Sequence, residues 1–111
     1  MQQLTPLQAC SARPGAAVDA IGLQVDELTA AGVVGHMQLG PDRHTPGGIV
    51  HGGVYATAID SAASVGASAA VADRGMVAVG LTNTAYFLRP LPSGLVTVAA
   101  TAPNQGRTQQ L

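Results

Sequence analysis

The chain has 111 residues, a net charge of −1 and 10% charged residues. This length is enough for one compact domain and too short for two. Its five arginines are scattered and it has no lysine, so we exclude the clustered basic surface that nucleic-acid binding requires. The single cysteine, Cys10, fits a reducing compartment, and we expect a cytoplasmic protein.

The low content of charged residues also indicates how the surface is used. Typical domains carry about 25% charged residues, so we expect part of this surface to be buried against another subunit. No apolar run reaches the roughly 20 residues of a membrane-spanning helix without interruption by His, Gly or Pro. The N-terminus lacks a basic start followed by an apolar run, and we therefore expect neither a membrane protein nor a secreted one.

The first part of the chain is predicted to be an arm followed by a hairpin. Residues 1–18 show no sustained hydrophobic period, which indicates an N-terminal arm or short docking helix before a domain over residues 19–111. Apolar residues alternate over 21–26 and again over 33–39, as in two strands. A turn near residues 30–32 would join them.

The rest of the chain is predicted to contain one long helix and further strands. Residues 40–48 are rich in Gly and Pro, as in a loop, and residues 53–72 have no proline and apolar residues at helical spacing. Small apolar residues on nearly every side of this helix indicate that protein surrounds it. Strands are predicted over 76–88 and 95–102, and the start of another over 107–111. This order indicates an α+β fold in which an antiparallel sheet wraps a helix.

Polar residues recur three or four apart along the predicted helix and form one stripe: Thr57, Asp60, Ser61, Ser64 and Ser68. Asp60 is the only ionisable group in it. A carboxylate desolvated by Ala and Val must be paired, hydrogen-bonded or protonated, and such groups are often found at reactive sites. The alternative is an aspartate that bonds neighbouring hydroxyls or faces water.

A glycine-rich segment, residues 47–53, leads into the helix N-terminus. Unpaired N–H groups and the positive end of the helix dipole meet there, which favours anion binding. An oxyanion could reach the amide of Gly52 or Gly53 directly, because glycine has no side chain to exclude it. The alternative is a tight turn packed on the sheet, with His51 as a turn or capping residue.

Other chemistries are not supported by the motifs. The glycine-rich segment is not followed by Gly-Lys-Ser/Thr and does not follow a strand, which disfavours nucleotide binding. The sequence contains no Gly-x-Ser-x-Gly motif, which disfavours a serine hydrolase. The three histidines lack nearby acids or cysteines at ligand spacing, so no metal is expected.

His51-Gly52-Gly53, followed by Asp60 nine residues after the histidine and Ser64 one helical turn later, resembles the hotdog-fold acyl-CoA thioesterases. The resemblance is to the group that contains phenylacetyl-CoA and 4-hydroxybenzoyl-CoA thioesterases, and it covers about residues 22–111. Short stretches at 79–81, 87–90 and 106–108 occur in the order and spacing of that family's strands after the helix.

The resemblance implies a hotdog fold and hydrolysis of a small aryl- or acyl-CoA thioester to the free acid and coenzyme A, with no metal or redox cofactor. Asp60 would be the general base or the nucleophile. Gly52 would donate its amide to the oxyanion, and Ser64 would position the acid or the water. The substrate-binding candidates are His51, Gly53, Thr45, Thr82 in the acyl pocket, and Arg89 and Arg107 for the phosphates of coenzyme A.

The sequence departs from this family in two places. Thr45 stands where many relatives have Gln or Asn in contact with the thioester. Relatives also continue through the strand that begins at Arg107 and add another, so we expect the last strands of the fold to be missing here. A non-catalytic acyl-CoA or lipid-binding module on the same fold is therefore the second hypothesis. A double-bond hydratase is the third hypothesis, because the His-plus-acid pair that it would need is not found in the sequence.

Helix geometry predicts an assembly. Gly52 and Asp60 are roughly 12 Å apart along one helix, too far to act on one carbonyl together. Antiparallel pairing of two helices across a twofold axis would bring Gly52 of one protomer to Asp60 of the other. We therefore expect a homodimer with acyl-CoA as its substrate, or a dimer of such dimers, as the family resemblance also implies.

Overall fold

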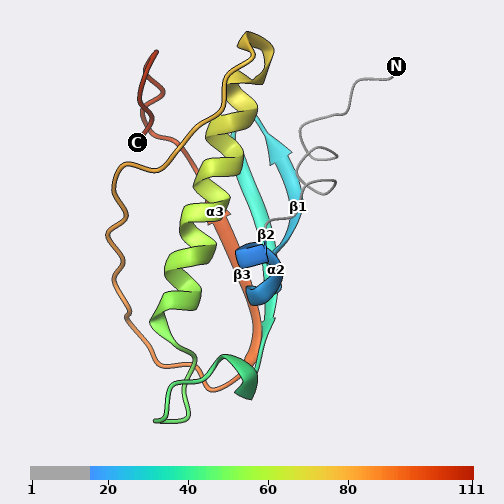
Figure 1. Cartoon of the computed structure of the whole chain (residues 1–111), viewed down its shortest axis with the longest axis vertical. Coiled ribbons are helices and arrows are strands. Elements are labelled where there is room, and N and C mark those ends of the chain that lie inside the picture. Colours follow the sequence, from blue (N-terminus) through green and yellow to red (C-terminus); the bar gives the residue numbers. More distant parts are fainter. Residues whose placement is uncertain (1–15) are drawn as a thin grey trace.

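The computed structural model describes residues 16–111, so Cys10 and most of the expected arm lie outside the described residues. The expected boundary between residues 18 and 19 stays a prediction. The described chain forms one long helix, one short helix, two 3₁₀ turns and a three-stranded antiparallel sheet (Figure 1). In chain order the elements are α2 (Ala16–Ile21), β1 (Gln24–Thr29), β2 (Gly32–Leu39), η1 (Pro41–Arg43), α3 (Gly52–Val71), η2 (Ala72–Arg74) and β3 (Gly94–Ala100).

The sheet has the order β1-β2-β3, and both pairings are antiparallel. The predicted hairpin is confirmed, because β1 and β2 meet at a turn between Thr29 and Gly32. The Thr29 hydroxyl accepts the Ala31 N–H at 3.2 Å and supports the turn. Gly32 has φ of 153°, and a Cβ there would lie 2.2 Å from the Ala100 carbonyl oxygen, so the turn requires glycine at this position.

The first strand begins later than the alternation of apolar residues predicts. Ile21 is the last residue of α2, and Leu23 lies between α2 and β1. Gly22 turns the chain with φ of 72°, and its N–H donates to the carbonyl oxygens of Val18 and Asp19. Ile21 and Leu23 are nevertheless buried. The alternation of apolar residues therefore predicts burial correctly. Here, however, the buried residues belong to the end of α2 and to the linker before β1 and not to a strand.

The core lies between α3 and the sheet. Val54, Ala58 and Ala62 form the buried face of α3, and alternate residues of β2, among them Met37 and Leu39, are buried against that side. The predicted helix over 53–72 and the predicted strand over 95–102 are confirmed, apart from end residues. The described residues of this one chain leave the outer face of α3 open, with Ile59 45% exposed, so the expectation that protein surrounds the helix stays a prediction about an assembly.

Residues 76–90, which we call the strap, do not form the strand predicted over 76–88. The strap is an irregular extended segment that runs alongside α3 (Figure 1). A strand needs a hydrogen-bonded neighbour, and within the described chain the strap runs beside α3 and pairs with neither outer strand, β1 or β3. Much of the strap's apolar surface is therefore exposed, including Val77, Val79 and Leu81.

The strand expected to begin at 107–111 is also absent. Residues 104–111 double back on themselves instead: the Gly106 N–H donates to the Gln109 carbonyl, and the Leu111 N–H donates to the Asn104 carbonyl. This local pairing uses backbone groups that a strand would offer to the sheet. Among residues 16–111, no helix is both long and apolar enough to span a membrane.

The packing of β2 under α3 predicts how stability is distributed. Met37 is fully buried, so Met37→Ala should leave a cavity and lower the free energy of unfolding by about 2–5 kcal/mol. Gln38, its exposed neighbour on the same strand, provides the control, and Gln38→Ala should change the value by less than about 0.5 kcal/mol. Urea denaturation followed by circular dichroism measures both, and equal effects would contradict this placement of the core.

Candidate functional site

The glycine-rich segment delivers the chain to α3 through a histidine cap. His51 is the N-cap residue, with extended φ and ψ of −64° and 134°, and its Nδ1 accepts the Gly53 N–H at 2.8 Å. The Gly53 amide is therefore occupied. The Gly52 N–H lies in the first turn, where no intrahelical acceptor exists, and no acceptor for it is found within the described part of the chain. Of the two amides considered from the sequence, Gly52 is the available one.

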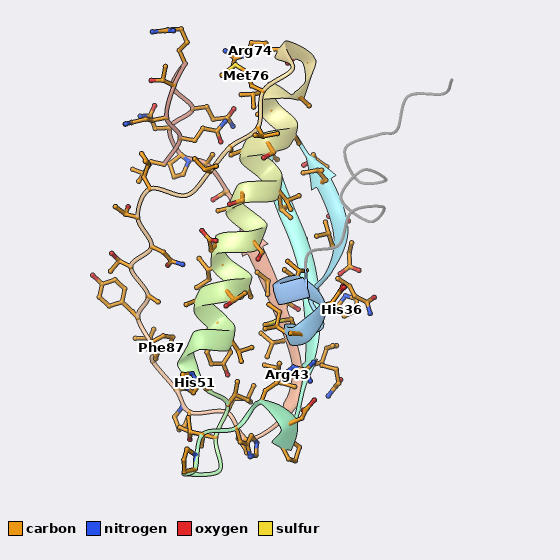
Figure 2. All side chains as sticks on the ribbon, viewed as in Figure 1. His36, Arg43, His51, Arg74, Met76 and Phe87 are labelled. Atoms are coloured by element: carbon orange, nitrogen blue, oxygen red, sulfur yellow. The ribbon has the colours of Figure 1, made fainter. Side chains whose placement is uncertain are left out.

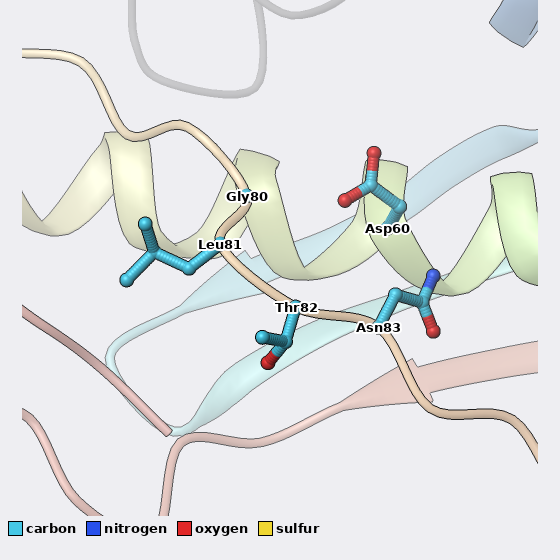
Figure 3. A pocket seen from close by; sticks show the side chains of 5 residues that line it. All are labelled: Asp60, Gly80, Leu81, Thr82 and Asn83. Carbon is cyan, nitrogen blue, oxygen red and sulfur yellow. The ribbon is translucent and has the colours of Figure 1, made fainter.

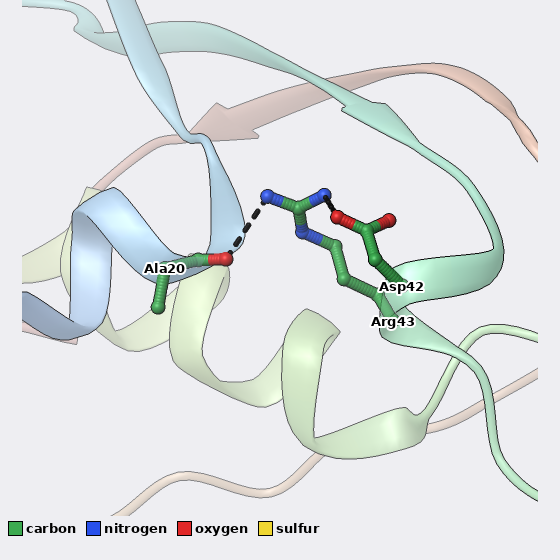
Figure 4. Close-up of polar contacts among 3 residues, drawn as sticks. All are labelled: Ala20, Asp42 and Arg43. Carbon is green, nitrogen blue, oxygen red and sulfur yellow. Dashed lines mark hydrogen bonds and ion pairs between the residues drawn. The ribbon is translucent and has the colours of Figure 1, made fainter.

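Arg43 holds the loop that carries this cap. Its guanidinium donates to the Ala20 carbonyl at 2.9 Å and to the Asp42 carboxylate at 2.6 Å (Figure 4). The Arg43 carbonyl in turn accepts the His51 N–H at 2.8 Å. Arg43 thus connects the end of α2 with the residue that caps α3. Sequence reasoning did not single out Arg43, and no local motif marks it.

An aromatic ring lies against the start of the helix. A Cβ on Gly52 would be 3.0 Å from Cζ of Phe87, so the ring packs directly on the glycine. Phe87 also lies 6.2 Å from Tyr55 between ring centroids. Figure 2 places Phe87 beside His51 at the same end of α3. The sequence stretch 87–90 was noted for the resemblance, but Phe87 was missed as a site residue.

A pocket of about 280 Å³ borders this helix end. It brings together three of the predicted site residues, Thr45, Gly52 and Arg89, with the rings of Tyr55 and Phe87. The pocket is mostly apolar, and its lining includes one cationic residue and the first residue of α3. Such a place can hold an apolar group and an anionic oxygen at once.

Asp60 lines a second pocket, of about 230 Å³, together with Gly80, Leu81, Thr82 and Asn83 (Figure 3). The strap crosses α3 here, and Asp60 Oδ1 lies 2.8 Å from where a Cβ on Gly80 would be. Asp60 and Thr82, both predicted site residues, are thus brought together. Asp60 is exposed, so this chain alone does not provide the desolvation that its Ala and Val neighbours suggest.

Two side-chain hydrogen bonds hold the strap on either side of Asp60. Asn83 Nδ2 donates to the Ala56 carbonyl at 3.0 Å, and the Ser68 hydroxyl accepts the Ala78 N–H at 3.0 Å. Because the strap has no strand partner, these bonds contribute to holding the wall of the Asp60 pocket. Asn83 was missed by sequence reasoning, since its partner is a backbone carbonyl 27 residues away.

Other predicted site residues lie apart from these pockets. Ser64 is half-buried one turn after Asp60 and lines neither pocket. Arg107 is exposed in the turn at 104–111, away from both. Gly52 and Asp60 themselves line different pockets, as their spacing on one helix requires. No group of three metal-ligating side chains is found in residues 16–111.

Comparison with known proteins assigns the family. The family model described as Thioesterase superfamily matches residues 47–111, which include both pockets' helix residues and the strap. The chain belongs to the Thioesterase superfamily. It is 38% identical over 93 residues to a Mycobacterium tuberculosis protein named "Putative esterase", covering 82% of this chain and 66% of that protein. The chain thus spans 66% of the length of that curated relative.

A second relative and two solved structures extend the comparison. The chain is 29% identical over 93 residues to the 1,4-dihydroxy-2-naphthoyl-CoA hydrolase of Listeria monocytogenes, covering 84% of this chain and 75% of that enzyme. The M. tuberculosis structure matches with a TM-score of 0.80 at 36% identity, over 84% of this chain and 75% of the other. A Haemophilus influenzae thioesterase structure matches with a TM-score of 0.82 at 28% identity, over 96% and 73%. The expected hotdog fold is confirmed.

The two side-chain hydrogen bonds that hold the strap predict a local response to mutation. Asn83→Ala removes the bond to the Ala56 carbonyl, so the strap should separate from α3 more often and chymotrypsin should cut faster at Tyr86 and Phe87. The free energy of unfolding should fall by only about 0.5–1.5 kcal/mol.

The control for this change is Asn104→Ala, since within residues 16–111 the hydrogen bonds of Asn104 involve its backbone alone. Mass spectrometry of the fragments locates the cut. Cleavage at unchanged rates in Asn83→Ala would show that this bond does not hold the strap.

Proposed function

We propose that the protein is an acyl-CoA thioesterase that hydrolyses a small aryl- or acyl-CoA to the free acid and coenzyme A. The observation that carries this proposal is the pair of groups on α3: a Gly52 amide for which residues 16–111 offer no acceptor, and the Asp60 carboxylate beside the strap. Membership of the Thioesterase superfamily supports it, as does likeness to a relative named as a CoA hydrolase.

Gly52 would stabilise the oxyanion. When a nucleophile adds to the thioester carbonyl, the oxygen gains negative charge, and the Gly52 N–H together with the positive end of the α3 dipole would stabilise it. One such donor typically contributes about 2.7–4 kcal/mol to the transition state. Thr45 and Arg89 line the same pocket. We propose that Arg89 contacts the phosphates of coenzyme A and that Thr45 lies beside the thioester.

Asp60 would supply the base or the nucleophile. As a base it takes a proton from water while the water oxygen bonds to the carbonyl carbon, and the thiolate of coenzyme A leaves with the electrons of the C–S bond. As a nucleophile it bonds to the carbonyl carbon itself, the C–S bond breaks as the thiolate of coenzyme A leaves, and water then hydrolyses the resulting anhydride to the free acid and the Asp60 carboxylate. Thr82 would line the acyl group next to Asp60, and we assign Ser64 to positioning the acid or the water. Arg107 is the second candidate for the coenzyme A phosphates, and we place the reaction in the cytoplasm.

The two groups would meet only between protomers. They are roughly 12 Å apart along α3 and line separate pockets. A homodimer with antiparallel α3 helices gives two equivalent sites, each with Gly52 from one protomer and Asp60 from the other. The exposed outer face of α3 around Ile59 and the low charge of the chain favour this assembly. A dimer of such dimers is the larger assembly compatible with it.

The role of Asp60 predicts a large and selective loss of activity. Asp60→Asn keeps the shape of the side chain and removes its basicity, so kcat for thiol release should fall about 10²- to 10⁴-fold. Asp73→Asn makes the same change at an exposed position in η2 and should leave kcat within about twofold of the unsubstituted chain, as surface changes usually do.

The assay is thiol release from a panel of aryl and aliphatic CoA esters, with circular dichroism to confirm folding. Turnover in Asp60→Asn that matches the Asp73→Asn control would rule out the proposed role of the carboxylate.

The shared site predicts complementation between two inactive variants. Gly52→Pro removes the amide hydrogen at the first helical residue, where proline is well tolerated, and the extended His51 suits a following proline. The partly exposed Phe87 ring must shift for any side chain at residue 52, so Gly52→Ala, which keeps the N–H, is the control.

Gly52→Pro and Asp60→Asn should each be nearly inactive alone. After co-refolding they should recover about a quarter of the unsubstituted activity, because about half of random dimers are mixed and each mixed dimer has one intact site. No recovery in a mixture shown by mass spectrometry to contain mixed dimers would refute a site shared between protomers.

A further inference from the structure

We infer that His51 is a positioning residue that determines which amide at the start of α3 is free for the oxyanion. By accepting the Gly53 N–H it leaves the Gly52 N–H as the available donor at the start of α3. This inference rests on the proposed function. It differs from the sequence-based role of His51 as a substrate-binding residue, because here the imidazole acts through the helix backbone.

The cap has little freedom to rearrange. The His51 Nδ1 lies 2.8 Å from the Gly53 nitrogen, and a Cβ on Gly53 would come within 3.1 Å of that Nδ1. Glycine at position 53 therefore lets the ring lie close over the first turn. On the other side of the first turn, Gly52 meets the Phe87 ring. The two glycines thus serve different neighbours, one the capping ring and the other the pocket.

The histidine backbone is fixed as well as its ring. The His51 N–H donates to the Arg43 carbonyl, and the His51 carbonyl accepts the Val54 N–H at 3.0 Å. Arg43 is itself held by the Ala20 carbonyl and the Asp42 carboxylate. A continuous chain of hydrogen bonds therefore runs from α2 through η1 to the cap of α3. The direction of the Gly52 N–H depends on this chain.

The cap requires an unprotonated Nδ1. Protonated imidazole carries hydrogens on both ring nitrogens, so Nδ1 would face the Gly53 N–H as a second donor. The positive ring would also lie at the positive end of the helix dipole. The titratable or charged groups on the elements that meet this helix end are Asp42, Arg43, His44, Tyr55 and Arg89. Acid should therefore break the cap and misplace the Gly52 amide.

Two substitutions separate positioning from substrate contact. His51→Asn keeps a side-chain acceptor at the N-cap and cannot titrate, whereas His51→Ala removes the acceptor. With His51→Ala, kcat for thiol release should fall on the order of 10- to 100-fold with KM nearly unchanged, as expected for a misplaced catalytic group. With His51→Asn, kcat should return to within about threefold of the unsubstituted chain. Because asparagine cannot be protonated, kcat of His51→Asn should decline less in acid than kcat of the unsubstituted chain.

A second measurement does not depend on turnover. In the unsubstituted chain the NMR chemical shift of the Gly53 amide proton should change as the pH is lowered, and in His51→Asn it should stay nearly constant over the same range. If no CoA ester is hydrolysed by the unsubstituted chain, the proposed function fails while this measurement still tests the cap. If His51→Ala does not fold, the inference is tested by the pH dependence of kcat and of the Gly53 amide shift in His51→Asn, each compared with the unsubstituted chain.

Two results would overturn the inference. One is a Gly53 amide that does not respond to pH in the unsubstituted chain. The other is a His51→Asn variant whose kcat keeps the same decline in acid as the unsubstituted chain. A rise in KM without loss of kcat in His51→Ala would instead support direct contact between His51 and the substrate.

Discussion

The close contact between α3 and β2 is the constraint on which the rest of the structure depends. Ala58 and Ala62 are almost fully buried, and a Cβ on Gly66 would be 2.9 Å from the Val33 side chain. Small residues at these three positions let the helix lie so near the sheet. Because that face is fixed, Asp60, two positions after Ala58, must point away from the core. The small-residue seam therefore orients the catalytic candidate.

The start of α3 depends on the same contact but adds a polar constraint. A helix leaves its first amides without acceptors, and each must be capped or solvated. Here His51 satisfies Gly53, while Gly52 lies open beside an aromatic ring. The pattern His-Gly-Gly thus has a separate physical reason at each position: an acceptor, an open amide, and room for the acceptor's ring. A site for a developing negative charge results from incomplete capping.

The sequence predicted what local periodicity and local chemistry determine. The long helix, the hairpin and the strand at Gly94–Ala100 follow from spacing within each segment, and the motif around His51 located the helix start. Thr45, Gly52 and Arg89 were found together in one pocket, and Asp60 and Thr82 in the other. Arg43, Asn83 and Phe87 were missed, because each makes a contact with a residue at least 23 positions away and no sequence spacing encodes such contacts.

The strap shows why the strand prediction over 76–88 failed. Alternating apolar residues such as Val77 and Val79 indicate a strand face, but a strand forms only where a neighbour offers hydrogen bonds. Within the described chain the strap meets a helix, whose backbone groups are mostly paired, so side-chain bonds of Ser68 and Asn83 and the packing of Phe87 on Gly52 help to hold it. The alternating apolar residues of the strap still indicate a preference for strand structure. A partner surface that supplied backbone hydrogen bonds would satisfy that preference and cover Asp60 at the same time, so pocket closure and strap pairing would be one event.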